Sequence, residues 1–501
     1  MLSYLLLFSV LCADKPMMII NEDNSHFFGS RAANDMTIDG LNAFVDQYAN
    51  TAVTHLFLNP NAMTASFDSK TRDAIWETRN QVIPPDIPFA KAWVDNARLL
   101  KERGLDPYAV WIARSREKNI SPWLTMRMND IHDVDNTTNY MHSTYWLTHP
   151  EYWRVPYESK KSWTDRALNY AMPAVREHNM AFLAELLERY DPDGIELDWM
   201  RFGYHFRLGQ ERAGAEILTQ FMRDARTLTD AWSKKRGHPI QLGARVPADP
   251  DAAVGLGMDG VRWAREGLID LLVPTPFWAT ADFDIPVEEW KKRIDDATAH
   301  VKIAPGTEVL LRAYPGGEAI TNDLASVYGF ASGAWARGAD AIYLFNYMDP
   351  APILGGTEAY RTLLEKGLSP DFVNTQPRRY VITYRDTVPA GVSNNAQLPF
   401  DLNQNFAELR FYVPAVSDES KISLFIGFAD MAPADISASL NGSKDAERIS
   451  QEVPESVIDV KSALRFVLPA NALETGQNVV RIAPIVTTAT GRITWAELHA
   501  E

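Results

Sequence analysis

Cysteine is nearly absent from this chain of 501 residues, and its single occurrence is Cys12. One thiol cannot form an intramolecular disulfide, and a zinc site built from several thiolates is excluded. Basic residues are also in deficit, because 49 Lys and Arg stand against 65 Asp and Glu, which gives a formal net charge of −16. A surface of that charge repels phosphate backbones, so we predict no nucleic-acid partner.

Long apolar runs are confined to the N-terminus. Residues 2–12 (LSYLLLFSVLC) form an apolar segment that is too short to span a bilayer and has the length of a signal-peptide core. We therefore predict a signal peptide over residues 1–13 and an exported protein, periplasmic or extracellular. No later segment is long and apolar enough to predict a membrane span.

Residues 14–370 alternate apolar, strand-like runs with amphipathic helical stretches. Strands are expected at 17–21, 52–59, 120–127, 193–199, 240–246, 268–275, 309–314 and 340–347. Between them, apolar residues recur every three or four positions, as in 175–190 and 215–232. Eight such units predict an α/β domain of the (β/α)8 TIM-barrel type. A doubly wound open sheet is the alternative, although no glycine-rich phosphate loop follows any strand.

The pattern changes after residue 375 to short segments of alternating polarity. They lie at 378–386, 407–415, 421–429, 463–470, 478–486 and 492–500. Pro, Gly, Asn and Asp separate them, which is typical of antiparallel β-structure. The sequence therefore predicts an all-β sandwich, jelly-roll-like, over residues 376–501, linked to the barrel around residues 370–377.

Two acidic residues lie two positions apart in the fourth predicted strand. The period of two places Glu196 and Asp198 on one face, and that face points into the barrel. Two carboxylates are costly to bury there unless they are paired or used. Because barrel active sites lie at the C-terminal strand ends, we predict that Asp198 is catalytic. Glu196 lies one layer deeper, where a structural ion pair explains it as well as chemistry does.

The residues around this strand resemble a known family. Residues 148–153 (THPEYW) and 168–202, which end in YDPDGIELDWMRF, resemble the glycosyl hydrolase-like barrels of the family 10 type, where a HPEW element and a YDxDGIxxDYxR strand occur in that order. The resemblance implies a glycoside hydrolase-like barrel, with Asp198 at the strand's second aspartate and Arg201 at the arginine that follows. Trp199 replaces the family's tyrosine and Gly203 opens a different loop, which affects the substrate more than the fold.

Glycoside hydrolysis requires a second carboxyl group as acid, base or nucleophile. A chitinase-type DGxDxDxE motif is incomplete, because Met200 stands where that motif has its acid. Glu196 is one candidate. The others are Glu22 and Asp23 at the end of the first strand, Asp130 at the end of the third, and Glu318 in the loop after the predicted seventh. The resemblance to barrel glycosidases favours Asp198 with Glu318 or Glu22, whereas a cap, a turn or a solvated carboxylate explains either partner equally.

Arginines form a second group at the predicted strand ends, namely Arg127, Arg201, Arg245 and Arg312. Ion pairs with buried carboxylates explain them, and so does a glycan that carries sulfate or carboxylate, because guanidinium forks match those oxyanions. The other residues predicted to bind substrate are Asp130, His132, Trp278, Asn346 and Tyr347. Residues 129–136 (NDIHDVDN) are rich in oxygen but lack the spacing of a calcium loop, so we predict no metal and no cofactor.

The sequence thus predicts an exported glycoside hydrolase that cleaves O-glycosidic bonds of a polysaccharide or oligosaccharide with two carboxylates. The anionic character of the glycan is left open, and the sandwich is read as an accessory or carbohydrate-binding-like domain. A non-catalytic carbohydrate-binding barrel is the alternative, because no second acid is self-evident. No pattern in the sequence indicates an oligomeric state.

Overall fold

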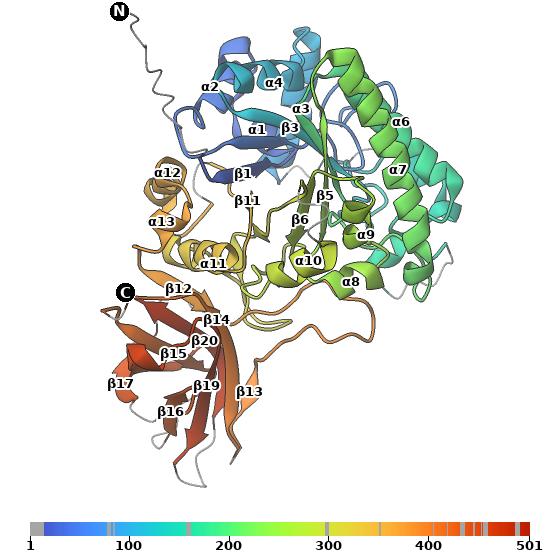
Figure 1. Cartoon of the computed structure of the whole chain (residues 1–501). Coiled ribbons are helices and arrows are strands. Elements are labelled where there is room, and N and C mark those ends of the chain that lie inside the picture. The colour runs from blue at the N-terminus through green and yellow to red at the C-terminus, as the bar shows by residue number, and fades with distance from the viewer. Residues whose placement is uncertain are drawn as a thin grey trace, which may run out of the picture.

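The computed structural model describes residues 15–77, 82–83, 86–156, 162–295, 300–349, 352–403, 405–417, 419–430, 436–443, 446–451, 453, 459–485 and 491–501. The predicted signal peptide over residues 1–13 lies outside these residues. The described chain forms a mixed α/β unit, followed by two antiparallel β-sheets packed beside it (Figure 1).

The α/β unit is built on one curled parallel sheet. Its strands are β1 (Met17–Glu22), β2 (His55–Leu58), β3 (Ser121–Arg127), β4 (Gly194–Asp198), β5 (Gln241–Pro247), β6 (Leu271–Thr275), β7 (Lys302–Ile303), β8 (Gly306–Thr307) and β11 (Ala341–Phe345). The order is β7-β6-β5-β4-β3-β2-β1-β11-β8. β7 pairs with β6 and β8 pairs with β11, so the short segment 302–307 contributes the strands at both ends of this sheet. The sheet is TIM-barrel-like, in agreement with the prediction.

The predicted position of one strand is wrong. The structure places the seventh strand position at β7 and β8, residues 302–307, and not at residues 309–314. Pro305 and Gly306 interrupt the apolar run there, which hides the strand in the sequence. Within 309–314, β9 (Leu310–Leu311) pairs antiparallel with β10 (Ile320–Thr321) in a separate hairpin. The residue that directly follows the seventh strand is therefore Glu308.

Helices surround the sheet. They are α1 (His26–Ser30), α2 (Ile38–Asp46), α3 (Pro88–Glu102), α4 (Pro107–Glu117), α5 (Thr144–Thr148), α6 (Pro173–Arg189), α7 (Glu211–Arg236), α8 (Pro250–Gly255), α9 (Gly260–Arg265), α10 (Val287–Ile294), α11 (Leu324–Ala336), α12 (Gly356–Lys366) and α13 (Pro370–Val373). Local chemistry sets their ends: the Asp106 side chain accepts the N–H groups of Tyr108 and Ala109 at the start of α4, and Gly237, with φ of 81°, ends α7.

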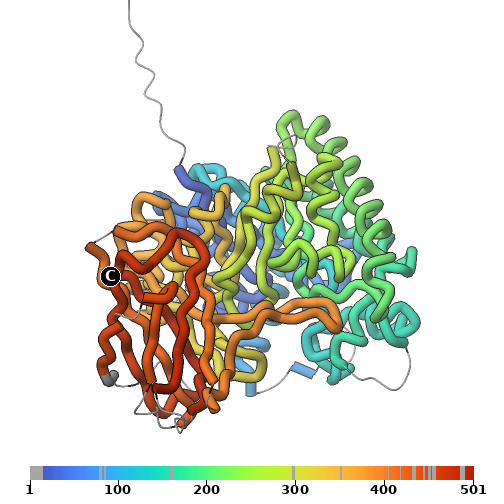
Figure 2. The backbone as a smooth tube through the Cα atoms, turned by 60° about the horizontal axis from the view of Figure 1, so that its bottom comes forward, coloured from blue at the N-terminus to red at the C-terminus, as the bar shows by residue number. Residues whose placement is uncertain are grey.

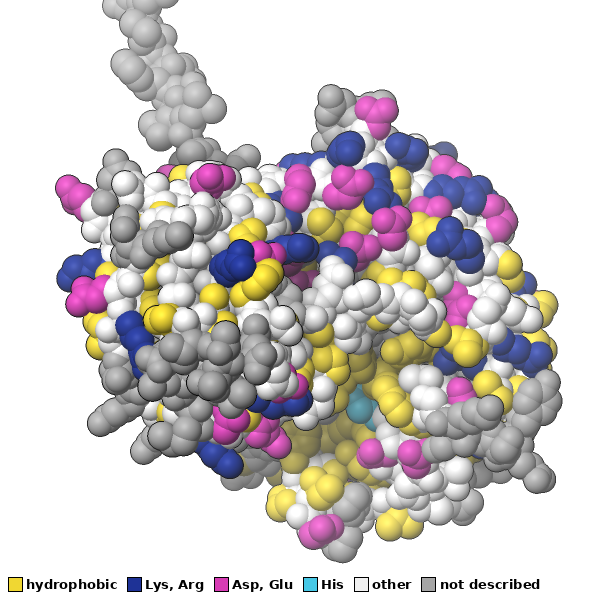
Figure 3. All heavy atoms as spheres, turned by 90° about the horizontal axis from the view of Figure 1, so that it is seen from below, with side chains coloured by type: hydrophobic (Ala, Val, Ile, Leu, Met, Phe, Trp, Pro, Cys, Tyr) yellow, Lys and Arg dark blue, Asp and Glu magenta, His cyan; other side chains and the backbone are white. Residues whose placement is uncertain are grey.

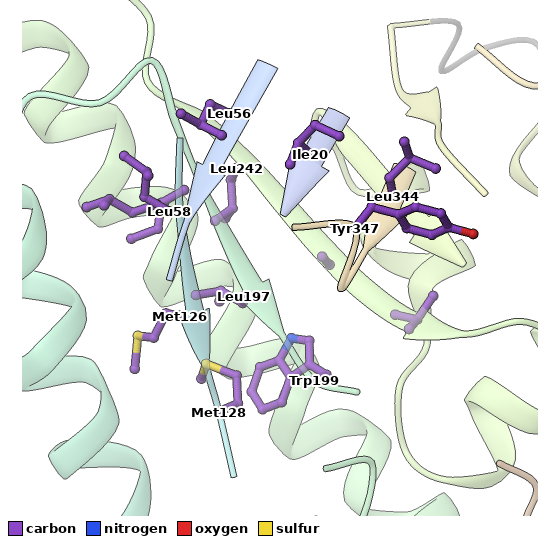
Figure 4. Packing of buried hydrophobic residues seen from close by; sticks show 14 of the residues in the cluster. Ile20, Leu56, Leu58, Met126, Met128, Leu197, Trp199, Leu242, Leu344 and Tyr347 are labelled. Atoms are coloured by element: carbon purple, nitrogen blue, oxygen red, sulfur yellow. The ribbon is translucent and has the colours of Figure 1, made fainter. Parts of the chain in front are cut away.

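Successive residues of the parallel strands point alternately to two hydrophobic cores, one between the sheet and the helices and one inside the sheet. The outward-facing residues pack against the helices, and Figure 4 shows a part of that cluster, including Leu56, Leu197 and Leu344. The inward-facing residues fill the sheet's interior, where Phe57 and Trp123 stack with ring centroids 4.7 Å apart. A Cβ at Gly194 would lie 2.4 Å from the Trp123 ring, so glycine is needed there to admit the indole.

The C-terminal part consists of two antiparallel sheets with a shared hydrophobic core. One contains β12 (Arg378–Val381), β13 (Phe400–Asp401), β15 (Ile422–Phe428), β17 (Glu447–Gln451), β18 (Ser462–Leu468) and β20 (Arg492–Ala500), and the other β14 (Ala407–Val413), β16 (Ile436–Leu440) and β19 (Gly476–Pro484). In β14 the core-facing residues alternate with more exposed ones, as the pattern predicts. The jelly-roll connectivity stays a prediction.

The segment between β12 and β13 leaves the sandwich and runs along the α/β unit before it returns (orange in Figures 1 and 2). Arg385 in this segment forms an ion pair with Asp249 at 2.7 Å, next to α8. The two parts of the chain are thus in contact beyond a simple linker. Within the ranges described above, no helix has the length and apolar character needed to cross a membrane.

Candidate functional site

The predicted pair on β4 lies inside the sheet, as its spacing indicates. Asp198 is 1% exposed, and its Oδ2 accepts a hydrogen bond from Arg245 Nη1 at 3.1 Å. Its Oδ1 accepts the backbone N–H groups of Met200 and Arg201 at 3.0 and 3.1 Å. Arg245 also donates to Thr275 Oγ1 at 2.8 Å. This buried ion pair joins β4 to β5 and β6.

Glu196 lies one layer deeper and is fully buried. Its Oε2 accepts hydrogen bonds from Thr125 Oγ1 at 2.5 Å and from Tyr343 OH at 3.0 Å. Burial, reinforced by the negative charge of Asp198, raises the pKa of Glu196 to about 8. The side chain is therefore protonated at neutral pH, and it belongs to the packed interior beneath the strand ends.

A second cluster of acidic residues and an arginine lies at the C-terminal ends of β1 and β3. Arg127 forms ion pairs with Asp23 and with Asp130, and its side chain is 4% exposed. Burial alone would raise the pKa of Asp130, but the neighbouring His132 and Arg127 hold it well below its usual range. Asp130 Oδ1 lies 2.8 Å from His132 Nδ1. Asp130 thus stays ionised and fixes the imidazole.

His132 and Arg201 are joined at the pocket surface. Arg201 Nη2 lies 3.2 Å from His132 Nε2, and because a guanidinium only donates, Nε2 must accept and the ring proton must be on Nδ1, toward Asp130. The Arg201 guanidinium also lies 5.4 Å from the centroid of the Phe345 ring. Burial and the charge of Arg127 lower the pKa of Arg201 to about 10, so it remains a cation at neutral pH.

Glu308, which the sequence reasoning missed, completes the group. It is 2% exposed, its Oε1 accepts the Val309 N–H at 2.8 Å, and its Oε2 accepts from Asn346 Nδ2 at 2.8 Å. Burial raises the pKa of Glu308 to about 8, although the charges of Arg201 and Arg245 act in the opposite direction. A signal for this residue was present, since Glu308 directly follows the short apolar run VKIAPGT.

His132, Arg201 and Asn346, the partner of Glu308, line a pocket of about 940 Å³. It is lined by Ile131, His132, Asp133, Val134, Asp135, Asn136, Asn139, Trp163, Arg201, Phe202, Phe277, Trp278 and Asn346. Figure 3 shows a hollow on the face seen from below, with hydrophobic side chains along its walls and a histidine at depth. The pocket follows the C-terminal ends of β3, β4, β6 and β11, where barrel sites are expected.

Two of the predicted catalytic carboxylates lie elsewhere. Glu22 points away from the sheet interior and contacts Tyr48 and His26, with its Oε2 2.7 Å from His26 Nδ1. It raises the pKa of the largely buried His26, against the effect of burial, to about 10. Glu318 is exposed, and its backbone N–H donates to Asp459 Oδ2 of the sandwich at 3.0 Å. The structure therefore does not bring either carboxylate to Asp198.

Two of the predicted substrate-binding residues are also placed differently. Arg312 donates to the backbone carbonyls of Ala279 and Gly317, in the loops after β6 and β9. Tyr347 is fully buried, and its hydroxyl lies 2.7 Å from Asn322 Nδ2 and 3.1 Å from the Glu308 carbonyl oxygen. Trp278, in contrast, is 44% exposed at the pocket edge. The long segment between β3 and α6 contains α5 and the 3-10 helices Pro150–Tyr152 and Trp163–Arg166.

One wall of the pocket is held by the segment from the sandwich. The Asp386 carboxylate accepts the backbone N–H groups of Phe277, Trp278 and Ala279, at 2.8 to 3.1 Å. From the other side, Arg245 donates to the carbonyl oxygens of Pro276 and Phe277. The loop after β6 is thus fixed between the sheet interior and the inter-domain segment.

We expect Asp386→Ala to loosen this loop, because three N–H groups lose a buried acceptor. A buried donor left without a partner costs about 1 to 3 kcal/mol. The measurement is amide hydrogen exchange of Phe277 to Ala279, together with chemical denaturation, and Asp224→Ala on the exposed face of α7 is the control. Exchange at these three amides equal to that of the unmodified chain would show that Asp386 does not hold the loop.

No group of three or more His, Cys, Asp or Glu side chains is arranged to hold a metal ion in the part of the chain that the structure describes. The polar groups beside the pocket pair with one another instead. The arrangement offers two buried carboxyl groups with raised pKa, those of Glu196 and Glu308, together with the ion-paired carboxylates of Asp130 and Asp198. Three guanidinium groups, those of Arg127, Arg201 and Arg245, lie among them.

Comparisons with known proteins assign no family. No protein-family profile matches the chain, and no curated protein matches it in sequence. The family 10-type resemblance therefore stays a prediction. Solved structures do match: α-L-fucosidase isoenzyme 2 from Paenibacillus thiaminolyticus has 12% identity and a TM-score of 0.44, over 73% of this chain and 51% of that one. The chain thus spans about half of that protein.

Two further matches are of the same kind. The PgaB (BpsB) glycoside hydrolase domain from Bordetella bronchiseptica has 11% identity and a TM-score of 0.40, over 70% of this chain and 99% of that one. A putative α-L-fucosidase from Bacteroides thetaiotaomicron has 12% identity and a TM-score of 0.36, over 96% and 94%. These matches are to glycoside hydrolase structures, and at such values they do not assign an activity.

Proposed function

We propose that the chain is a glycoside hydrolase that binds and cleaves a glycan in the pocket at the strand ends. The observation that carries this proposal is the pocket itself, with Trp163, Phe202, Phe277 and Trp278 among its walls and with the buried carboxyl group of Glu308 hydrogen-bonded to its lining residue Asn346. Flat aromatic faces stack on the apolar faces of sugar rings, and protonated and ionised carboxyl groups are the pair that glycoside hydrolysis uses.

The two carboxyl groups would have different roles. Glu308, neutral at pH 7, donates its proton to the glycosidic oxygen as the bond from that oxygen to the anomeric carbon breaks. Asp198, which forms the ion pair with Arg245, supplies the carboxylate that stabilises the positive sugar ring. Arg245 interacts with both carboxyl groups, which supports placing them in one site. Water then bonds through its oxygen to the anomeric carbon and gives a proton to the Glu308 carboxylate, which restores the acid.

Export belongs to the same proposal, since residues 1–13 have the composition of a signal peptide and polymeric glycans are encountered outside the cell. Asp386, which holds the loop with Phe277 and Trp278, gives the sandwich segment a part in shaping the pocket. We therefore treat the sandwich as a support of the site as well as an accessory domain.

A carbohydrate-binding barrel without catalysis is the second candidate. It is favoured by the hydrogen bonds of Asp198, because both of its oxygens already accept donors and the residue is 1% exposed. A carboxylate that must remain so engaged would position Arg201 and Arg245 rather than react. Both candidate functions require that the chain binds a glycan, but only the hydrolase releases shorter products.

The test combines binding with product formation. A panel of neutral, sulfated and uronate-containing oligosaccharides is titrated calorimetrically, and release of new reducing ends is assayed on every oligosaccharide that binds. We expect cleavage by the unmodified chain, and binding without cleavage by Asp198→Asn. If the unmodified chain binds a glycan that it never cleaves, the hydrolase assignment fails, and if Asp198→Asn cleaves at the original rate, the role of Asp198 fails.

A further inference from the structure

The three arginines at the strand ends are not paired alike. Arg127 contacts the carboxylates of Asp23 and Asp130, and Arg245 contacts that of Asp198. Arg201 has no carboxylate oxygen within 4 Å among the described residues. Its hydrogen-bonded partner is His132, whose Nε2 lies 3.2 Å from Arg201 Nη2.

Most of the donors of Arg201 are unused. The guanidinium carries five N–H groups, and in the described structure only Nη2 donates a hydrogen bond, to His132 Nε2. The Nε atom is buried and has no acceptor within the ranges that the structure describes. The residue as a whole is half-buried, but this Nε has lost its contact with water without receiving an acceptor, which is costly for a charged group.

This cation lies against the pocket. Arg201 is a lining residue together with His132 and Asn346, and its guanidinium is flanked by Phe202 and Phe277, each with a ring centroid 5.7 Å away. The rings keep the guanidinium plane in place and exclude water from its sides. A ligand that enters the pocket therefore meets a positioned fork of N–H donors beside aromatic surfaces.

We propose that the pocket recognises a sugar bearing an oxyanion, either a uronate carboxylate or a sulfate ester, and that Arg201 is the group that binds it. The inference rests on the proposed function in that the ligand is taken to be a glycan. A planar guanidinium forms two parallel hydrogen bonds to either oxyanion, which lysine cannot do.

Acidic residues at the pocket rim do not cancel this preference. Asp133 and Asp135 also line the pocket, but both are exposed, and Asp133 accepts a hydrogen bond from Asn139 Nδ2 at 2.9 Å. Exposed charges are screened by water and salt, whereas Arg201 acts in a more buried setting. The excess of negative charge on the chain as a whole is likewise a property of the outer surface.

The test compares matched ligand pairs on the unmodified chain, so that it needs no variant to fold. The pairs are an oligouronide with its neutral methyl ester, and a sulfated oligosaccharide with its desulfated form, titrated calorimetrically at low and at high salt. We expect at least about 10-fold tighter binding of the anionic member of one pair, weakened by salt. The pair that shows it distinguishes carboxylate from sulfate.

Variants then assign the preference to Arg201. Arg201→Met is expected to remove the preference for the anionic member of the pair, while Arg98→Met on the exposed face of α3 retains it. Equal affinities within both pairs, or an unchanged preference in Arg201→Met, would overturn the inference. Anion-selective binding without cleavage would refute only the hydrolase, and cleavage restricted to neutral glycans would refute only the anion site.

Discussion

Replacing Glu308 with Gln is expected to lower kcat on unactivated glycosides by about 10³-fold while the fold is retained. Loss of a general acid typically costs 10² to 10⁴ in rate, on the order of the effect predicted here. Gln keeps the size of the side chain and can still accept from Val309 N–H or Asn346 Nδ2, but it has no proton to give. The measurement is steady-state kinetics on a cleaved oligosaccharide.

The leaving group provides the internal control for this prediction. A substrate with an activated aryl leaving group needs little protonation, so Glu308→Gln should retain much more of its rate on that substrate. The unmodified chain should lose activity as the pH rises through about 8, where Glu308 gives up its proton. Glu102→Gln, at an exposed position of α3, should behave as the unmodified chain. Equal loss on both substrates would contradict the acid role.

A stability measurement shows whether Glu308→Gln loses activity because it lacks the acid or because it unfolds. The folded-state pKa of Glu308 is raised above its value in the unfolded chain, so the folded state binds the additional proton between about pH 4.5 and 8. The stabilisation from this group is complete below about pH 4.5 and is lost as the pH rises toward 8. Glu308→Gln should therefore be at least as stable as the unmodified chain at pH 8, in thermal unfolding.

Replacing Arg245 with Met is expected to have the largest effect on stability. It would leave Asp198 buried without its cation, and Thr275, Pro276 and Phe277 would lose a donor to their oxygens. Removing one partner of a buried ion pair costs about 3 to 5 kcal/mol. We expect a loss of that size in urea denaturation, with loss of cleavage.

A double variant identifies the cause. In Arg245→Met with Asp198→Asn the uncompensated charge is gone, so part of the lost stability should return, whereas activity should not. Arg98→Met, which removes an exposed arginine, is the control and should change stability by less than about 0.5 kcal/mol. A double variant as unstable as the sum of the two single ones would show that the ion pair is not the origin of the loss.

The sequence predicts most of the sheet because parallel strands buried on both faces are continuous apolar runs. The seventh strand fails that rule, since Pro305 and Gly306 divide it into two pairs of residues. Because the seventh strand was expected at 309–314, the sequence analysis considered Glu318 and not Glu308 as the acid that follows it. On β4 the prediction of the facing direction was correct, because Glu196 and Asp198 are polar residues between apolar ones.

Strand β1 shows why the site could be predicted only in part. All six of its residues are buried, so no alternation of polarity reveals which of them face inward. Asn21 faces the interior, where its amide reaches Tyr343 OH at 2.6 Å, and Glu22 therefore faces the helices. Asp23, one residue further, returns to the strand ends and pairs with Arg127. Because neighbouring residues point in opposite directions, Asp23 and not Glu22 joins the cluster of Arg127 and Asp130.

Hydrolysis of a glycan transfers an oxygen atom from water to the product, so isotopic labelling reports it directly. An oligosaccharide that saturates the pocket is incubated with the unmodified chain in ¹⁸O-labelled water, and the products are weighed by mass spectrometry. We expect the unmodified chain to form shorter oligosaccharides that carry one ¹⁸O for each bond cleaved. Glu308→Gln should form the same products far more slowly. An oligosaccharide that stays bound, intact and unlabelled would contradict the proposed hydrolysis.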